Sequence, residues 1–361
     1  MKPKKSIISS PENSPSKTKK KISWSESLVD SSHEGDFENG EFHGNGTLFN
    51  ENEIIKYQGK FQKSKRHGQG VLFLQNNIQI EGIFEENELI SGKIFENRNK
   101  KEPGFLAYEG EFKNNQKHGK GTLYFKSGFK YIGDFENNSR NGTGKLFRKN
   151  GDICYNGSWK NDKKSGGTVH YKTGHKYEGD MIDNKRQGQG TYFWSDHVFY
   201  SGNWENDERS GNGVLSKYGL VIFEGEWIND RYKSGVYNYH GDKQLLKYRG
   251  DFNDNNERHG NGEVLWTDGS KYIGEWKNDM REGKGTEFFN DGKVRYVGDW
   301  KNGRRTGVGI YYFRNGVKYE GDWLGDLRHG KGSLFDADGN LSYKGDWFKD
   351  NGCSLIRQKF Y

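Results

Sequence analysis

A segment of the form Tyr-x-Gly-Asp/Glu-Trp/Phe, followed about seven residues later by Gly-x-Gly, recurs roughly every 23 residues along almost the whole chain. One copy begins at Tyr108 and continues to Gly119 and Gly121. A fixed period of this length indicates a linear array of structural repeats. Each unit of such an array contacts only its neighbours, so the 361 residues need not divide into two or three globular domains.

About fourteen copies come into register when the tyrosine is set as position 0. They start at His33, Tyr57, Ile80, Tyr108, Tyr131, Tyr155, Tyr177, Tyr200, Phe223, Tyr248, Tyr272, Tyr296, Tyr319 and Tyr343. Position +2 is Gly in every copy, and position +4 is aromatic in all but one, where Met181 stands. Positions 0, +2 and +4 share one face of a strand, and a ring can lie flat over the intervening glycine. We therefore predict that each copy is a two-stranded hairpin and that stacking buries each aromatic stripe against its neighbours.

Charged residues follow the same period. Position +3 is Asp or Glu in ten of the fourteen copies, and Arg or Lys stands near position +9, as at Arg140 and Arg209. We expect the two to pair across their own hairpin as structural charges rather than as a binding code. Polar residues such as those at 114–117 suggest a hairpin loop longer than the tightest types.

The repeated Tyr-x-Gly-x-Trp/Phe and Gly-x-Gly elements resemble the MORN (membrane occupation and recognition nexus) repeat family over about residues 33–352. The resemblance implies an all-β fold, an elongated and twisted antiparallel sheet of stacked hairpins in a single layer. The copies starting at Ile80, Tyr155 and Phe223 have a shifted or broken second glycine pair, and we expect local distortion there.

The ends of the chain differ from the array in composition. Residues 1–30 carry seven lysines against three acidic residues, whereas the remainder is nearly balanced at 50 basic against 47 acidic. We interpret residues 1–32 as a basic, flexible arm, 33–352 as the array with an irregular insertion at 96–104, and 353–361 as a cap. Two cysteines and no apolar leader or spanning run favour the cytoplasm.

Motifs that carry chemistry are not evident in the sequence. The Gly-x-Gly pairs lack the Gly-Lys-Ser/Thr ending of a phosphate-binding loop and lead into strand-like segments. Histidines that precede these pairs, such as His43 and His67, should lie about 10 Å apart in adjacent repeats, too far to share a zinc ion. We expect no enzymatic activity, no cofactor, no metal site and no nucleic-acid partner.

The main hypothesis is a structural scaffold whose aromatic, glycine-floored groove receives partner proteins of a large assembly. Resemblance to MORN proteins of radial spoke heads implies a place in the cytoskeleton, in the axoneme of motile cilia or flagella. A second copy of the chain also stays open as a partner. The candidate groove residues are Tyr108, Tyr131, Trp159, Tyr200, Trp204, Trp227, Tyr272, Trp276, Trp300 and Trp323.

The alternative hypothesis is a peripheral membrane adaptor that binds anionic phospholipids through the basic arm and the repeat surface. Each lysine near an anionic surface adds about 1 kcal/mol of attraction. The candidate contacts are Lys17, Lys19, Lys20 and Lys21.

Overall fold

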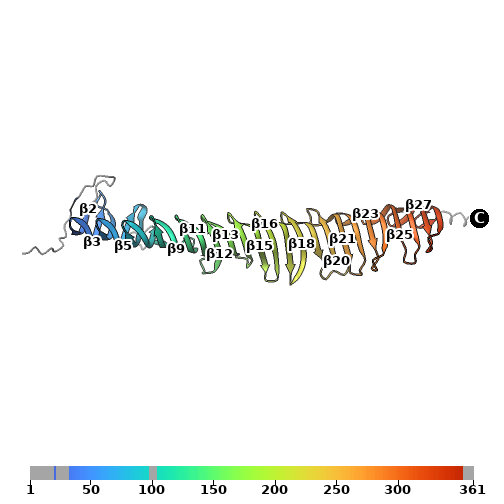
Figure 1. Ribbon diagram of the computed structural model, residues 1–361, viewed down its shortest axis with the longest axis horizontal. Helices are drawn as coiled ribbons and strands as arrows, with labels where there is room; N and C mark the ends of the chain where they lie inside the picture. Colours follow the sequence, from blue (N-terminus) through green and yellow to red (C-terminus); the bar gives the residue numbers. More distant parts are fainter. Residues whose placement is uncertain (1–19, 22–31, 97–103, 353–361) are drawn as a thin grey trace, which may run out of the picture. The chain divides into compact units, whose positions relative to one another are not determined.

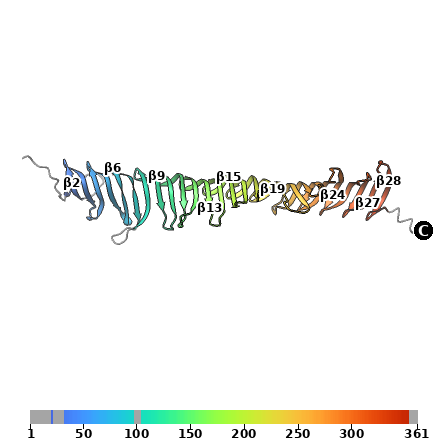
Figure 2. The same cartoon turned by 90° about the horizontal axis from the view of Figure 1, so that it is seen from below.

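The computed structural model describes residues 20–21, 32–96 and 104–352, and almost all of them lie in antiparallel β-strands or the turns between them (Figure 1). The chain divides into two compact units, residues 1–170 and 171–361. In each unit the strands follow one another in chain order, each pairing with the next (Figure 2). The all-β fold of stacked hairpins that the sequence predicts is confirmed.

The strands of the first unit are β1 (Lys20–Lys21), β2 (Ser32–Glu38), β3 (Glu41–Phe49), β4 (Ile55–Gln62), β5 (Lys65–Leu74), β6 (Ile78–Glu85), β7 (Glu88–Glu96), β8 (Phe105–Lys113), β9 (Gln116–Tyr124), β10 (Lys130–Glu136), β11 (Ser139–Phe147), β12 (Ile153–Lys160) and β13 (Lys163–His170). A 3-10 turn, η1 (Gln75–Asn77), precedes β6. The short β1 pairs with β2 and covers the free edge of the first hairpin.

The strands of the second unit are β14 (Lys176–Ile182), β15 (Lys185–Ser195), β16 (Val198–Glu205), β17 (Glu208–Lys217), β18 (Leu220–Ile228), β19 (Arg231–Asn238), β20 (Leu245–Phe252), β21 (Arg258–Trp266), β22 (Lys271–Lys277), β23 (Met280–Phe288), β24 (Val294–Lys301), β25 (Arg304–Tyr312), β26 (Lys318–Leu324), β27 (Leu327–Phe335), β28 (Leu341–Phe348) and β29 (Asn351–Gly352).

Most hairpins turn in two residues, both with positive φ, which is the type I′ geometry that suits the twist of paired strands. Asn161 and Asp162 form such a turn between the paired residues Lys160 and Lys163. The same holds at residues 114–115, so the expectation of a longer loop there is wrong. Asn and Asp dominate these turns because they tolerate the left-handed conformation.

A bulge in the second strand of each hairpin explains the Gly-x-Gly pair. Between the pairs Gly59↔Gly70 and Phe61↔Arg66, the second strand holds two more residues than the first. The first glycine of the pair, Gly68, takes a φ of 69°, which glycine adopts without strain. The second glycine pairs directly with position +2 of the first strand.

The three copies that depart from the sequence pattern keep the hairpin but use a shorter bulge. In the copy that starts at Tyr155, Ser158 pairs with Gly166 and Trp159 with Lys164, which leaves one extra residue instead of two. The copies that start at Ile80 and Phe223 have the same arrangement. The distortion expected at these copies is therefore confined to the bulge. The insertion at 96–104 lies mostly outside the described residues.

Candidate partner-binding surface

The inner face of each unit is a ladder of aromatic rings. The ring at position 0 makes edge-to-face contacts with the +4 ring of its own hairpin and with the +4 ring of the next. Tyr131, for example, contacts Phe135 and Trp159 at centroid distances of 5.3 and 5.2 Å. Tyr200 contacts Trp204 and Trp227 at 5.3 and 5.1 Å. Such contacts add about 0.5–1.5 kcal/mol each beyond the area they bury, so they link consecutive hairpins.

The hydroxyl of each position 0 tyrosine is satisfied inside the hairpin. Tyr200 donates to the carbonyl oxygen of Asn203 at 2.9 Å, and ten other tyrosines make the equivalent bond to the residue at +3. The ring lies against the paired glycines, and a Cβ on Gly213 would overlap it. Burial raises the pKa of Tyr200 to about 12. Tyr200 is therefore a neutral part of the core.

The tryptophans at +4 are anchored in a similar way. Each of the seven indole Nε1 groups donates to the carbonyl oxygen of a glycine in the preceding hairpin. Trp227 bonds Gly213 at 3.1 Å, and its side chain is only 2% exposed. A buried indole N–H without an acceptor would be costly, so these carbonyls fix both the position and the orientation of each ring.

Arginine at +9 joins consecutive hairpins rather than closing its own. The Nε of Arg209 donates to Oδ1 of Asp230 in the next turn at 2.7 Å, while its guanidinium lies 4.3 Å from the centroid of Trp227. Arg140, Arg186, Arg258, Arg305 and Arg328 repeat both contacts. The expectation that this arginine pairs with the +3 acid of its own hairpin is therefore wrong. The register pairs Arg209 with Trp204 at +4, so the arginine side chain lies on the inner face, opposite to the residue at +3.

The acid at +3 has a different partner, the bulge in its own hairpin. The Oδ2 of Asp134 accepts from the backbone N–H and the hydroxyl of Thr143 at 2.8 and 2.9 Å. Asp299 accepts the N–H of Val308 at 2.9 Å in the same way. This N–H belongs to the residue between the two glycines, where the bulge interrupts the ladder. The recurring carboxylate therefore compensates for the bonds that the bulge removes.

The ten aromatic residues that the sequence suggests as a partner groove all belong to this inner ladder. Their exposure ranges from 0% at the tyrosines to 5% at Trp276 and Trp323. The structure thus differs from the expectation of an open aromatic groove, because each ring is covered by its neighbours, by glycine backbone and by the stacked arginine. Of the four lysines suggested for anionic contacts, Lys20 and Lys21 form β1, and Lys17 and Lys19 lie outside the described residues.

Within each unit the outer face is open to solvent, and the backbone of the paired glycines forms a row along it. Glycines at +2 pair with second glycines of the same and the preceding hairpin, as in Gly121↔Gly133, Gly133↔Gly144 and Gly144↔Gly157. Because their Cβ direction points to the inner rings, only backbone lies on the outer side of this row. Side chains at +1 and +3 flank it, which makes a shallow channel across the strands. The alternation of residues in the sequence places the side chains at +1 and +3 on the face opposite to the rings. It does not show which of the two faces is covered by neighbouring side chains.

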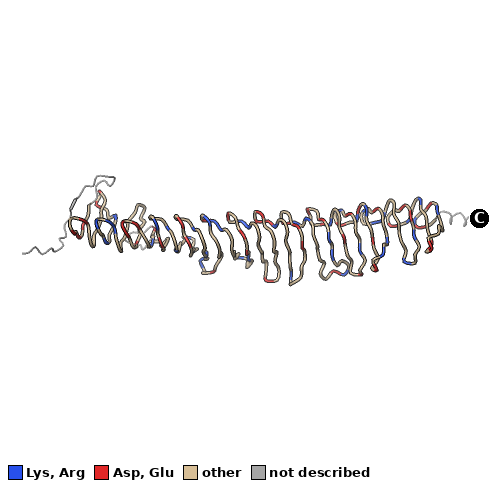
Figure 3. The backbone as a smooth tube through the Cα atoms, viewed as in Figure 1, with Lys and Arg blue, Asp and Glu red and all other residues tan. Residues whose placement is uncertain are grey.

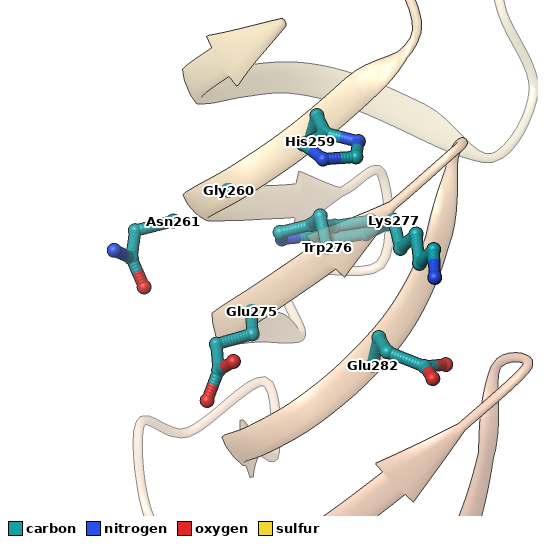
Figure 4. Close-up of a pocket in the computed structure, with 7 residues that line it drawn as sticks. All are labelled: His259, Gly260, Asn261, Glu275, Trp276, Lys277 and Glu282. Carbon is teal, nitrogen blue, oxygen red and sulfur yellow. The ribbon is translucent and has the colours of Figure 1, made fainter. Parts of the chain in front are cut away.

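A depression near the bulge of β21 is lined by His259, Trp276, Glu275 and Glu282 (Figure 4). Glu275 accepts the N–H of Lys284 at 2.9 Å, and Glu282 accepts the N–H of Asn302 at 2.9 Å. Figure 4 shows the two carboxylates directed away from one another. Both acids thus hold the backbone of the repeat, and they do not form an acid–base couple.

Two further features are absent from the described residues. No group of three or more His, Cys, Asp and Glu side chains among them is arranged to hold a metal ion. None of the helical segments there has the length and apolar character needed to cross a bilayer.

Comparison with known proteins gives one family. The model described as MORN repeat matches eleven segments, at residues 33–51, 57–77, 108–129, 131–153, 155–166, 177–198, 200–218, 248–271, 272–294, 296–318 and 319–341. The copies that start at Ile80, Phe223 and Tyr343 are not matched. No curated protein sequence matches the chain.

Solved structures give only weak likenesses. A streptogramin B lyase structure is 10% identical over 79% of this chain and 85% of the other, with a TM-score of 0.14. The computationally designed Ika8 protein is 12% identical over 77% and 86% of the two chains, with a TM-score of 0.16. Scores this low give no guide to the fold of this chain.

Proposed function

Because the chain belongs to the MORN-repeat family, we propose that it is a non-enzymatic scaffold that holds partner proteins in a cytoskeletal assembly. The observation that carries the proposal is the linkage between hairpins, since the ring ladder and the arginine bridges tie each repeat to the next. Side chains on the outer face are thereby held at regular intervals of roughly 10 Å within each unit. Such a surface suits contact with an extended partner more than binding of a small molecule.

The assembly that we propose is the axoneme of motile cilia or flagella, in a role like that of a radial spoke component. The support is the resemblance of a chain made almost entirely of MORN repeats to such components. Inter-repeat bonds that recur at almost every step also suit a part that must keep its spacing under mechanical load.

Isolation of the tagged protein from detergent-extracted ciliated cells tests the proposal. We expect the protein to stay with the insoluble cytoskeleton, to be enriched in isolated cilia, and to be released by salt together with other structural chains. Recovery in the detergent-soluble fraction as a free monomer would contradict the scaffold. Retention in the cell body cytoskeleton without enrichment in cilia would contradict the axonemal placement alone.

A peripheral membrane adaptor is the second candidate, and one observation favours it. The pairing of β1 with β2 holds Lys20 and Lys21 at the edge of the first hairpin, beside the rest of the basic segment in sequence. Sedimentation with phosphatidylserine vesicles tests it, with the full chain compared to a variant in which Lys17, Lys19, Lys20 and Lys21 are changed to Gln. Failure of the full chain to sediment with the vesicles at low salt would remove this candidate, and equal sedimentation of the two proteins would exclude these four lysines as the contact.

A further inference from the structure

Positive charge is concentrated in one stretch of the array. Residues 113–170 contain twelve Lys and Arg against four Asp and Glu, an excess of eight. Residues 32–96 contain six against eleven, and residues 171–352 contain 27 against 29 (Figure 3). The near neutrality of the whole array therefore conceals a basic segment on β9–β13. The arginine–aspartate bridges between repeats do not account for it, since each pairs one cation with one anion.

The outer face of this segment contains a groove. Gly121, Gly133 and Gly144 form its floor, and Gly157 continues it on the next strand. On one side stand Thr122, Ile132, Lys145 and Asn156, which are consecutive cross-strand neighbours. The other side has Lys120, Asp134 and Thr143. We call this channel across β9–β12 the basic groove.

Charges in the basic groove are not balanced internally. Asp134 is its only carboxylate, and it is already engaged by Lys120 and by the N–H and hydroxyl of Thr143. Among the described residues no carboxylate forms an ion pair with Lys145, which stands exposed on the groove wall. The same holds for the exposed Lys149 in the loop that follows β11. Two cations are therefore available to an anionic partner.

We propose that the basic groove binds an extended acidic segment of a partner protein, laid across β9–β12. This inference rests on the proposed scaffold function and names the chemistry of one partner. Three strand spacings of about 4.8 Å give a floor of about 14 Å, which roughly four extended residues span. A carboxylate of such a segment reaches Lys145 on the groove wall, and Lys149, beyond the end of β11, adds positive potential nearby. The Thr122 hydroxyl and the Asn156 amide bond the backbone of the segment.

Features of the groove favour a peptide over other polyanions. Stacking of nucleic-acid bases needs open ring faces, but Lys130 lies 5.3 Å from the centroid of Phe147 and occupies its face. An anionic membrane contacts a flat or protruding basic surface, whereas this one is recessed between two rows of side chains.

The test is fluorescence anisotropy of the full chain with a labelled twelve-residue peptide that alternates Glu and Thr. A peptide with Gln in place of Glu is the ligand control. The variant Lys145→Glu/Lys149→Glu reverses the two available cations. The matched control Lys293→Glu/Lys344→Glu changes charge equally at an exposed loop and an exposed strand position of the second unit.

We expect the Glu peptide to bind at low salt, with at least tenfold weaker binding to the groove variant and less than twofold change in the control variant. Equal weakening in both variants would show that the binding depends on overall charge alone, and it would overturn the proposal. So would absence of binding, or tighter groove-dependent binding of single-stranded RNA or of phosphatidylserine vesicles. Circular dichroism of each variant checks that the sheet is retained. Co-isolation of other chains from cells would persist if only the basic groove is wrong.

Discussion

The guanidinium of Arg209 lies 4.3 Å from the ring centroid of Trp227, although the two residues belong to consecutive hairpins. The same arginine donates three hydrogen bonds to Asp230, two to its side chain and one to its carbonyl oxygen. One residue thus links a ring of the core to the turn of the next repeat. Its planar, forked head makes both contacts at once, which a lysine cannot do.

Replacing Arg209 with Ala should therefore loosen the contact between neighbouring hairpins. We expect a local loss of about 2 kcal/mol, since a charged hydrogen-bond set and a cation–π contact are removed. In hydrogen exchange this corresponds to roughly 30-fold lower protection of amides in β18 and β19. Arg209→Lys should recover less than half of the loss. The control is Arg231→Ala, whose side chain is 52% exposed, and it should change protection by less than about 0.5 kcal/mol. An equal effect of the two alanine variants would contradict the bridging role.

The hydroxyl at position 0 can be removed in one copy and added in another. Tyr200→Phe should cost about 1 kcal/mol, because the carbonyl of Asn203 loses its donor. Phe223→Tyr should gain about the same amount, because Tyr155 bonds two carbonyls in a hairpin with the same short bulge. Thermal unfolding and local amide exchange measure both changes. Destabilisation by Phe223→Tyr would show that the short bulge of that hairpin excludes the hydroxyl.

Glycines whose Cβ direction points to the inner rings should tolerate no side chain. Gly213→Ala places a methyl group into the ring and hydroxyl of Tyr200, so we expect a cost of about 3 kcal/mol. Gly219 has a φ of 78° but no atom within 4 Å of an added Cβ, so Gly219→Ala should cost only about 1 kcal/mol through backbone strain. Denaturation curves distinguish the two. Similar curves would mean that the ring moves aside.

His33 replaces the tyrosine of the first hairpin and should make that hairpin sensitive to acid. Its ring is 2% exposed among Phe37, Phe42 and Phe61, and burial lowers its pKa from 6.5 to about 4. Because the folded pKa lies below the unfolded value, the stability contributed by the neutral ring is complete above pH 6.5. It falls as the pH drops towards 4, by at most about 3 kcal/mol.

Amide exchange in β2–β4 at pH 7.5 and 4.5 measures this acid sensitivity. The variant His33→Tyr restores the repeat residue and should remove most of the difference. If the variant loses protection at pH 4.5 as much as the natural chain does, carboxylates rather than His33 are responsible.

The inner ladder was predictable from sequence because alternation alone places positions 0, +2 and +4 on one face. The burial of that face was not predictable, because alternation does not show whether the ring of Trp227 contacts a partner protein or the neighbouring Arg209. The arginine bridge leaves a trace in the sequence, as Arg140 and Asp162 recur at a separation of 21 or 22 residues in later copies. A search for pairs within one hairpin does not find this bridge, because its two residues belong to consecutive repeats. The left-handed Gly68 also follows from three-dimensional bulge geometry rather than from strand alternation.

The proposed role is tested most directly by lysine cross-linking of the tagged protein in detergent-extracted cells, with the linked peptides identified by mass spectrometry. A scaffold should give links between the outer-face lysines of the array, including Lys120 and Lys145, and other structural chains that stay with it through purification. Recovery of the chain alone, with every link internal to it, would contradict the scaffold role.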